Sequence, residues 1–410
     1  MRARKPVVVA GGGIGGMAAA LGLGRRGIPC VVLEQADTLG AIGYGIQLGP
    51  NVFWALGALG IDEAVLRRAH QPPAILALDA RDGSEFVRIP AGPEFRARFT
   101  HPYVVIHRVD LHEILVDSCR RLPGVELRTG VSVGAAEETA GGVDVSTDGD
   151  TIEALALIAA DGLNSRFRAR IVPADAAPRP SGYVAHRTLV PREALAPHLF
   201  RREVIMWAGD GFHIVAYPLR NETLYNIVAV FRTDTFSDRM DTGRYRAEVQ
   251  HTYRDAHPDM KALLQLMDLE RRWPISDQTP TRQWTQGRVA LLGDSAHATL
   301  QSLAQGAGMA IEDAVCLTNC MAGSVATDGG VEQALKRYAR LRLTRTARVQ
   351  LESRTMWEMF HCGGIAADVR RDTYAHRSPG EYYDCLAWLY GNPAAFLGTA
   401  NAPERLRAAV

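Results

Sequence analysis

The sequence predicts an α/β protein in which a domain built on a parallel sheet is split by an inserted antiparallel β-sheet and followed by a helical C-terminal region. The first observation is the order VVVA (7–10), GGGIGG, an Ala-rich helical stretch and CVVLE (30–34), a βαβ opening with fully apolar strands. The second is a change, at about 181–232, to alternating segments rich in aromatic and β-branched residues, as in an antiparallel sheet. The third is RVALLG (288–293), which returns to the style of the first strands. The sheet-rich middle is therefore expected to be an insertion.

Composition and charge exclude several classes of protein. The chain has 410 residues, 47% of them hydrophobic, and a formal net charge of +1, so no global field favours nucleic acid or an anionic membrane. We find no secretory signal peptide and no run of about 18 apolar residues, which predicts no membrane span. The six cysteines are scattered, and Cys316 and Cys320 lack the further ligands of a zinc set. These features predict a cytoplasmic protein with free thiols, no metal and no nucleic-acid partner.

A glycine-rich turn after the first strand carries the first functional signal. Gly11, Gly13 and Gly16 form GxGxxG, which gives a tight turn, a close approach of the backbone to a pyrophosphate, and close packing of helix on strand. The helix that follows offers unpaired N–H groups to phosphates. Glu34 ends the second strand, where a carboxylate accepts hydrogen bonds from ribose hydroxyls. This context predicts a Rossmann-like domain that binds a dinucleotide, without deciding between NAD and FAD.

Two later strands end on an aspartate. Asp161 follows ALALIAA and opens DGxxSxxR, and Asp294 follows RVALLG and opens GDSAH. Ligands of open α/β sheets bind outside the carboxyl ends of the strands. Both carboxylates are therefore expected near Gly13 and Glu34, where they can hold the hydroxyls of a sugar chain.

The last third of the chain has the pattern of helices. GAGMAIEDAVCLTNCMAG predicts one helix, and a longer pattern runs from Glu332 to about Phe360. The longer pattern carries seven cations, which we interpret as a solvated helix face: Lys336, Arg337, Arg340, Arg342, Arg345, Arg348 and Arg354. The segment after it is rich in aromatic residues, and packing or a dimer contact explains it better than chemistry does: His361, Tyr382, Tyr383, Trp388 and Tyr390.

GxGxxG, DGxxSxxR and GDSAH, in this order, resemble the group A flavoprotein monooxygenases, the single-component FAD aromatic hydroxylases, over nearly the whole chain. The resemblance implies FAD that is bound tightly but not covalently. By position it makes Asp294 a ligand of the ribityl chain, places Arg108 of HRVDL near FAD, and gives the DG motif a role with FAD and the pyridine nucleotide. The helix that opens at Gly306 and Ala307 would point its N-terminus at the flavin pyrimidine ring, which is anionic when reduced. The family usually has Asn at the position of Gly308.

The patterns and the resemblance together predict three units. An FAD-binding domain comprises 1–75, 100–172 and 275–345. A substrate-binding sheet domain comprises 76–99 and 173–274, and a helical C-terminal region with a dimer contact comprises 346–410. A single GxGxxG is present, so no separate domain is expected for NADH or NADPH.

The inserted sheet carries the candidate substrate residues. His213 and Tyr217 are four residues apart on one strand, so their side chains share a face. Gln301 stands where many members of the family have proline, which suggests contact with substrate. Within the family the chain looks most like the 3-hydroxybenzoate 6-hydroxylases, in which the residues that match His213 and Gln301 flank the substrate phenol, and those that match Tyr217 and Tyr103 line the pocket. From the residues alone, His213 also fits a satisfied core histidine, and Tyr217 also fits ordinary packing.

The resemblance implies that NADH or NADPH reduces FAD, and that reduced flavin and O2 form a C4a-hydroperoxide that hydroxylates a phenolic acid. The favoured reaction converts 3-hydroxybenzoate to gentisate. An imidazole with an unperturbed pKa of about 6.5 can take the phenol proton, which assigns His213 as the base, while the Gln301 amide holds the phenolic oxygen.

Other interpretations stay open. One is a salicylate-type hydroxylase that displaces the carboxylate, or a hydroxylase of a larger natural-product phenol. Another is a flavin reductase or dehydrogenase that uses no oxygen, and a third is a flavin-bound interaction protein without turnover. The sequence leaves open the identity of the aromatic substrate, the position of hydroxylation, the choice between NADH and NADPH, and the oligomeric state, for which we expect a homodimer.

Overall fold

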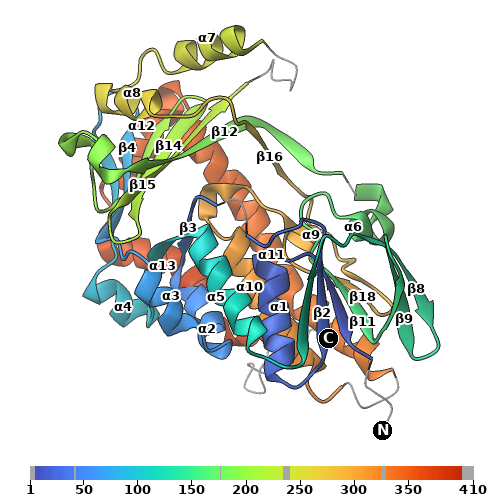
Figure 1. Ribbon diagram of the computed structural model, residues 1–410. Helices are drawn as coiled ribbons and strands as arrows, with labels where there is room; N and C mark the ends of the chain where they lie inside the picture. The colour runs from blue at the N-terminus through green and yellow to red at the C-terminus, as the bar shows by residue number, and fades with distance from the viewer. Residues whose placement is uncertain (1–4, 41–42, 176, 234–240, 325–328, 399–410) are drawn as a thin grey trace.

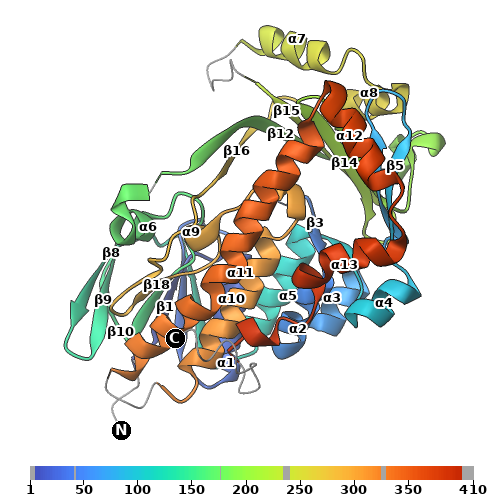
Figure 2. The same ribbon diagram turned by 180° about the vertical axis from the view of Figure 1, so that it is seen from behind.

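The computed structural model describes residues 5–40, 43–175, 177–233, 241–324 and 329–398. A parallel sheet with helices packed beside it forms the lower part of the molecule in Figure 1, and a second sheet forms the upper part. A long helix runs diagonally from the lower part to the upper part, as Figure 2 shows from behind. The predicted fold class, an α/β domain with an inserted antiparallel sheet and a helical C-terminal region, is confirmed.

The lower sheet has six strands in the order β17-β18-β11-β1-β2-β7, and only the β17–β18 pair is antiparallel. Val7 of β1 pairs with Ala156 on one side and with Cys30 on the other. Because β18 follows the upper sheet in sequence, the chain returns to complete the sheet that it began, as RVALLG predicts. The strands are β1 (Val7–Ala10), β2 (Cys30–Glu34), β7 (Val125–Thr129), β11 (Ala156–Ala159), β17 (Thr285–Gln286) and β18 (Val289–Leu291).

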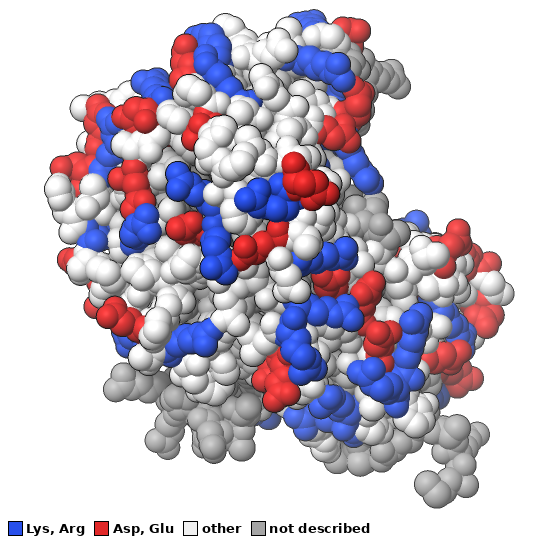
Figure 3. All heavy atoms as spheres, turned by 60° about the vertical axis from the view of Figure 1, so that its left-hand side comes forward, with Lys and Arg blue, Asp and Glu red and all other residues white. Residues whose placement is uncertain are grey.

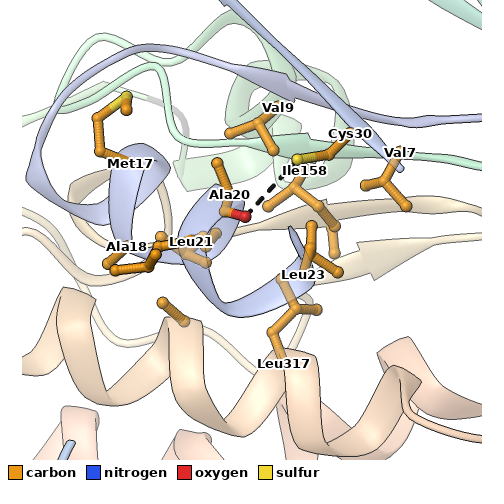
Figure 4. Close-up of a cluster of buried hydrophobic side chains, with 14 of the residues drawn as sticks. Val7, Val9, Met17, Ala18, Ala20, Leu21, Leu23, Cys30, Ile158 and Leu317 are labelled. Carbon is orange, nitrogen blue, oxygen red and sulfur yellow. Dashed lines mark hydrogen bonds between the residues drawn. The ribbon is translucent and has the colours of Figure 1, made fainter. Parts of the chain in front are cut away.

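Helix α1 (Ile14–Arg25) packs between this sheet and two further helices, α5 (Arg108–Arg120) and α10 (Gly306–Met321). Figure 4 shows Val7 and Ile158 of the sheet with Leu23 of α1 and Leu317 of α10, and all four side chains are fully buried. Burial of each such aliphatic side chain contributes about 1.5–3 kcal/mol. This core holds the carboxyl ends of the strands in fixed positions.

The remaining elements of the lower part surround that core. They are α2 (Pro50–Ala58), α3 (Asp62–Arg68), α6 (Arg166–Ile171), α9 (Asp294–His297), and the antiparallel strands β8 (Val133–Thr139), β9 (Gly142–Thr147) and β10 (Thr151–Ala154). A two-stranded antiparallel ribbon, β3 (Gly45–Leu48) with β6 (Val104–His107), contacts the upper sheet at β14. This ribbon therefore joins the two parts.

The upper sheet has seven strands in the order β16-β12-β15-β14-β13-β4-β5, antiparallel throughout except between β13 and β4. The strands are β4 (Ala74–Asp79), β5 (Glu85–Pro90), β12 (Arg179–Pro191), β13 (Val204–Gly209), β14 (Phe212–Leu219), β15 (Leu224–Arg232) and β16 (Trp273–Asp277). One face packs Phe212 and Ile214 against α7 (Thr242–Thr252) and α8 (Pro258–Gln265). The residues that alternate with them, from His213 onward, turn to the opposite face.

Helix α11 (Gly330–His361) corrects one interpretation of the sequence. The solvated face expected for its seven cations is wrong for Arg342 and Arg345, which are 0% and 4% exposed, because both form ion pairs with buried Glu312 of α10. A charge run on one helix does not reveal a carboxylate on a neighbouring helix. The domain boundary predicted at 345/346 falls within this continuous helix.

The chain after α11 closes the side of the upper sheet. Helix α12 (Gly364–Ala375) and α13 (Pro379–Tyr390) pack on β5, and α13 also contacts α4 (Pro93–Phe99). Short 3-10 turns complete the described structure: η1 (Pro173–Asp175), η2 (Arg192–Ala194), η3 (Pro197–Leu199), η4 (Gln301–Leu303) and η5 (Ala394–Phe396).

On the face drawn in Figure 3, basic and acidic side chains are interspersed, as a net charge of +1 leads one to expect. Of the helices in the described ranges, none is both long and apolar enough to span a bilayer. Among those same residues, no cluster of three or more His, Cys, Asp or Glu side chains could hold a metal ion.

Candidate active site

One cavity of about 690 Å³ lies between the two sheets and draws its walls from both. The lower wall includes Gly13, the strand end at Gly293 and Asp294, and the first turn of α10. The upper wall is formed by the face of β12, β14 and β15 that turns away from α7 and α8. The topology thus brings residues from three distant segments of the chain to one space.

The lower wall lies at the carboxyl ends of neighbouring parallel strands. Strands β2, β1, β11 and β18 lie side by side, and Glu34, the glycine turn, Asp161 and Asp294 stand at or just beyond their ends. Of these, Gly13 and Asp294 line the cavity. Glu34 instead accepts hydrogen bonds from the backbone N–H groups of Gly12 and Ala36 at 2.7 and 2.9 Å, which fixes the glycine turn.

The glycine turn has the shape that a dinucleotide requires. Gly11 has φ +112°, and a Cβ built on it would overlap the carbonyl oxygen of Ala160. A Cβ on Gly16 would overlap the carbonyl oxygen of Gly11, so only glycine lets α1 approach the strand this closely. At Gly13 nothing lies within 4 Å of such a Cβ, and this residue borders the cavity. The backbone there is open to a ligand.

Asp161 holds an unsatisfied oxygen next to this turn. Its Oδ2 accepts from the backbone N–H of Arg166 at 3.0 Å, whereas its Oδ1 is buried without a partner in the described part of the chain. Asp161 does not itself line the cavity, but both neighbours, Ala160 and Gly162, do. An orphaned buried carboxylate oxygen indicates a missing donor, such as the hydroxyl of a bound nucleotide.

Asp294 and the N-terminus of α10 form the floor of the cavity. The Asp294 side chain is accessible from the cavity, yet it is so closely surrounded by protein that desolvation raises its pKa, against the attraction of His297 and Arg108. Helix α10 begins at Gly306, and the described residues provide no side-chain cap for its first turn. The first N–H groups of a helix have no partner within the helix, and this turn, Ala307 included, borders the cavity. This end of the helix favours a negatively charged ligand.

His213 lies on the upper wall, is 2% exposed, and belongs to a chain of hydrogen bonds that fixes its tautomer. His361 Nδ1 lies 2.8 Å from the carbonyl oxygen of Trp357, which can only accept, so Nδ1 carries the proton. Burial lowers the pKa of His361 to about 4, so its Nε2 is an acceptor, and His213 Nδ1 donates to it at 2.7 Å. Burial, His361 and Arg187 hold the pKa of His213 well below its usual value of 6.5. The remaining nitrogen of His213, Nε2, therefore keeps its lone pair.

Gln301 lies on η4 and lines the same cavity as the upper sheet. Its Oε1 accepts a hydrogen bond from Arg187 Nη2 at 2.7 Å. An arginine can only donate, so the amide orientation is determined, and the Gln301 NH2 group remains for a ligand.

Tyr217 and Tyr103 meet at Gln47 of the β3–β6 ribbon. Tyr103 donates its hydroxyl proton to Gln47 Oε1, and the same amide lies beside the Tyr217 hydroxyl, whose pKa it lowers against the larger effect of burial. Burial raises the pKa of both hydroxyls, so both tyrosines stay protonated as donors. All three residues line the cavity, as does Arg108.

Three participants were missed from the sequence. Arg187 and Gln47 line the cavity, and His361, which the sequence assigned to packing or a dimer contact, hydrogen-bonds His213. The one signal in the sequence is Arg187 itself, a cation that alternates along β12 with Tyr183, Ala185 and Leu189. Gln47 and His361 carry no such signal.

Comparison with known proteins agrees with this geometry. The FAD binding domain family matches residues 4–353. The 3-hydroxybenzoate 6-hydroxylase of Polaromonas naphthalenivorans (strain CJ2) is 42% identical over 387 residues, which cover 94% of this chain and 96% of that protein. The 3-hydroxybenzoate 6-hydroxylase 1 of Aquipseudomonas alcaligenes is 38% identical over 387 residues, 94% of this chain and 97% of that one.

Among solved structures, Klebsiella pneumoniae HpxO complexed with FAD and uric acid shares the fold with a TM-score of 0.83 and 24% identity, over 95% of this chain and 98% of that chain. The dinucleotide predicted from the glycine motif is therefore FAD. With a family match over most of the chain and relatives at this identity, the chain belongs to the FAD-dependent aromatic hydroxylases, the group A flavoprotein monooxygenases.

Proposed function

We propose that the protein hydroxylates 3-hydroxybenzoate para to its hydroxyl group to give gentisate, using O2 and NADH or NADPH. The names of the two relatives support this substrate. The observation that carries the proposal is that His213 and Gln301 border the same cavity as Asp294 and the N-terminus of α10. A ring held by the first two residues would face a flavin held by the other two.

The residues present fit FAD. The open backbone at Gly13 would receive the pyrophosphate, Asp294 with Arg108 nearby would hold the ribityl chain, and Gly306 and Ala307 would face the pyrimidine ring. When bound, FAD supplies the electrons of the pyridine nucleotide and an electrophilic oxygen atom from O2. The chain's own part is to bind the ring, orient it, move its proton and exclude water.

His213 would accept the phenol proton at Nε2. The hydrogen bonds through His361 to the carbonyl oxygen of Trp357 leave this nitrogen unprotonated, and a low pKa keeps it so at neutral pH. Loss of the proton makes the ring electron-rich at the carbon para to the oxygen. General-base catalysis of this kind contributes typically about 10²–10⁴-fold.

Gln301 would hold the phenolic oxygen and set which ring carbon faces the flavin. Arg187 binds the amide oxygen and leaves the NH2 group, which would donate to an oxygen that becomes negative as the proton leaves. Orientation of reacting atoms is worth several kcal/mol.

Apolar side chains would keep the space dry. The cavity walls include Ile75, Leu76, Val215, Val228 and Leu300. Exclusion of water directs the oxygen atom to the ring and not to peroxide.

A panel of 2-, 3- and 4-hydroxybenzoate, given to the holoenzyme with NADH and then with NADPH, tests the proposal. Nucleotide oxidation, O2 uptake, peroxide, carbon dioxide and the aromatic product are measured together. We expect gentisate from 3-hydroxybenzoate in near one-to-one ratio with the nucleotide consumed. Catechol and carbon dioxide from 2-hydroxybenzoate would instead identify a decarboxylating hydroxylase, and nucleotide oxidation without any oxygenated product would identify a reductase.

We also propose a cytoplasmic homodimer. All six cysteines lie in the described residues and are unpaired, as in a reducing compartment. On α12, Ile365 and Val369 are 78% and 58% exposed, which is an apolar surface that a second copy could cover. Light scattering of the holoenzyme, with Ile365→Glu as the variant expected to dissociate it, tests the oligomeric state.

A further inference from the structure

Arg187 of β12 lies level with a position of β14 that is between His213 and Tyr217, the two candidate substrate residues of the upper sheet. In register, Arg187 pairs with Val228, and Val228 pairs with Val215. The neighbouring rows of the same face hold His213 and Tyr217, two residues before and after Val215. Arg187, Val215 and Val228 all line the cavity, so the guanidinium is placed where a ring between those rows would carry a substituent.

This cation has no carboxylate partner among the described residues. Its one side-chain hydrogen bond there is to the neutral Gln301. The groups that act on it electrostatically are a second cation, Arg108, and the hydroxyls of Tyr44 and Tyr217. Desolvation lowers the pKa of Arg187, because burial disfavours the charged guanidinium.

A second cation of the cavity shows that the protein can neutralise such a charge. Arg370 also lines the cavity, but it forms an ion pair with Asp79 at 3.7 Å, lies over the ring of Phe86, and donates to the carbonyl oxygen of Met359. Arg187 has none of these partners. A desolvated guanidinium without an anion is unfavourable unless a ligand provides one.

We propose that Arg187 binds the carboxylate of the aromatic substrate and restricts the enzyme to anionic phenols. The inference rests on the proposed function and names the residue that recognises the acid group. The same guanidinium fixes the Gln301 amide. The carboxylate and the hydroxyl of a meta-substituted ring would therefore be bound by two side chains that are hydrogen-bonded to each other. Carboxylate suits the planar, forked donor set of arginine.

Binding to the oxidised holoenzyme, followed by the change in the flavin spectrum, measures recognition without turnover. The probes are 3-hydroxybenzoate and 3-hydroxybenzamide, which has nearly the same shape and no charge. We expect the wild type to bind the benzoate about 10- to 100-fold more tightly than the benzamide. Arg187→Gln keeps an N–H donor for Gln301 but removes the charge, so it should abolish most of this ratio while the benzamide Kd changes little. Arg187→Lys should restore part of the ratio.

Arg370→Gln is the matched control, because it removes another cation of the same cavity and should leave the ratio unchanged. Equal wild-type affinity for the two probes would overturn the proposal without any variant. An equal loss for both probes in Arg187→Gln would also overturn it, because the arginine would then only hold Gln301. If no gentisate forms, the proposed reaction fails, and the same charge ratio measured with 2- and 4-hydroxybenzoate and their amides still tests Arg187.

Discussion

Two buried polar clusters of this protein are built on opposite principles. In the first, between α10 and α11, Arg342 donates to Glu312 at 2.8 Å and to Asp313 at 2.6 Å, and Arg345 donates to Glu312 at 2.7 Å. His297 adds a hydrogen bond to Asp313 at 2.5 Å. Every charge meets an opposite charge, and the carboxylates keep low pKa values despite complete burial.

In the second cluster, on the cavity, the charges are left open. Arg187 reaches a neutral amide, and His213 ends a hydrogen-bond chain with a free lone pair. Among the described residues that line the cavity, Asp294 is the one carboxylate, and it acts on Arg108. The comparison teaches that a satisfied cluster serves to hold helices together, whereas an unsatisfied one is completed by a ligand. Substitutions in the two clusters should therefore separate stability from activity.

The largest effect is expected at His213. His213→Ala should lower the rate of hydroxylation by about 10²–10⁴-fold, because the variant lacks the Nε2 atom that would accept the phenol proton. FAD should stay bound. Single-turnover product formation and the flavin absorbance check the two parts. His186→Ala is the control, since His186 lies in the same sheet but on the opposite face, against Tyr245 of α7, and should not change the chemical step. A His213→Ala enzyme with the rate and coupling of the wild type would remove the base from the mechanism.

The second effect should appear in stability. Arg342→Met removes the one cation that binds both Glu312 and Asp313, which stay buried, and should lower the free energy of unfolding by about 3–5 kcal/mol. Urea unfolding of the FAD-loaded protein measures it. Arg348→Met makes the same substitution six residues along α11, where Arg348 is half exposed beside Glu352, and should cost less than about 1 kcal/mol. Equal losses in the two variants would show that the buried cluster has no special role.

Acid should destabilise the fold through the buried histidines that the folded protein keeps neutral. Burial lowers the pKa of both His186 and His361 to about 4 from 6.5, so below pH 6.5 the unfolded chain binds protons that the folded chain refuses. Stability is therefore lost as pH falls, by roughly 2 kcal/mol for each histidine between pH 7 and pH 5. Unfolding free energies at pH 7, 6 and 5 check the slope, and His186→Gln should make it shallower. A slope unchanged in that variant would contradict the assignment.

Residues of the lower wall can be located from local motifs, whereas the upper wall holds residues that no local motif indicates, for a physical reason. Gly13 and Asp294 directly follow short buried strands, and parallel strands bring their ends to one edge whatever the rest of the chain does. The position of each residue is then set by a few neighbours in sequence. These motifs also carried the resemblance to the family.

The upper half depends on distances that no local pattern records. Whether Arg187 faces His213 is decided by the register of β12 on β15, and a slip of one residue would turn it to α7. His361 reaches His213 only because a helix that begins at Gly330 ends beside β14. To predict the burial of Arg342, one would likewise have to know which helix packs on α11.

The smallest effect tests the hydrogen-bond chain behind His213, where His361 acts as a positioning residue. His361→Phe removes the acceptor for His213 Nδ1–H, so the tautomer with a proton on Nε2 is no longer disfavoured. At roughly 0.5–1.5 kcal/mol for one hydrogen bond, kcat for hydroxylation should fall about 2- to 12-fold with little change in KM. His361→Gln offers an amide oxygen in place of the imidazole nitrogen and should recover most of the rate, whereas a merely structural role would lower FAD occupancy and stability in both variants. If His361→Phe hydroxylates as fast as His361→Gln across pH 6–8, the tautomer of His213 is set by the bound phenol and not by the protein, and the open cluster is less pre-organised than its geometry indicates.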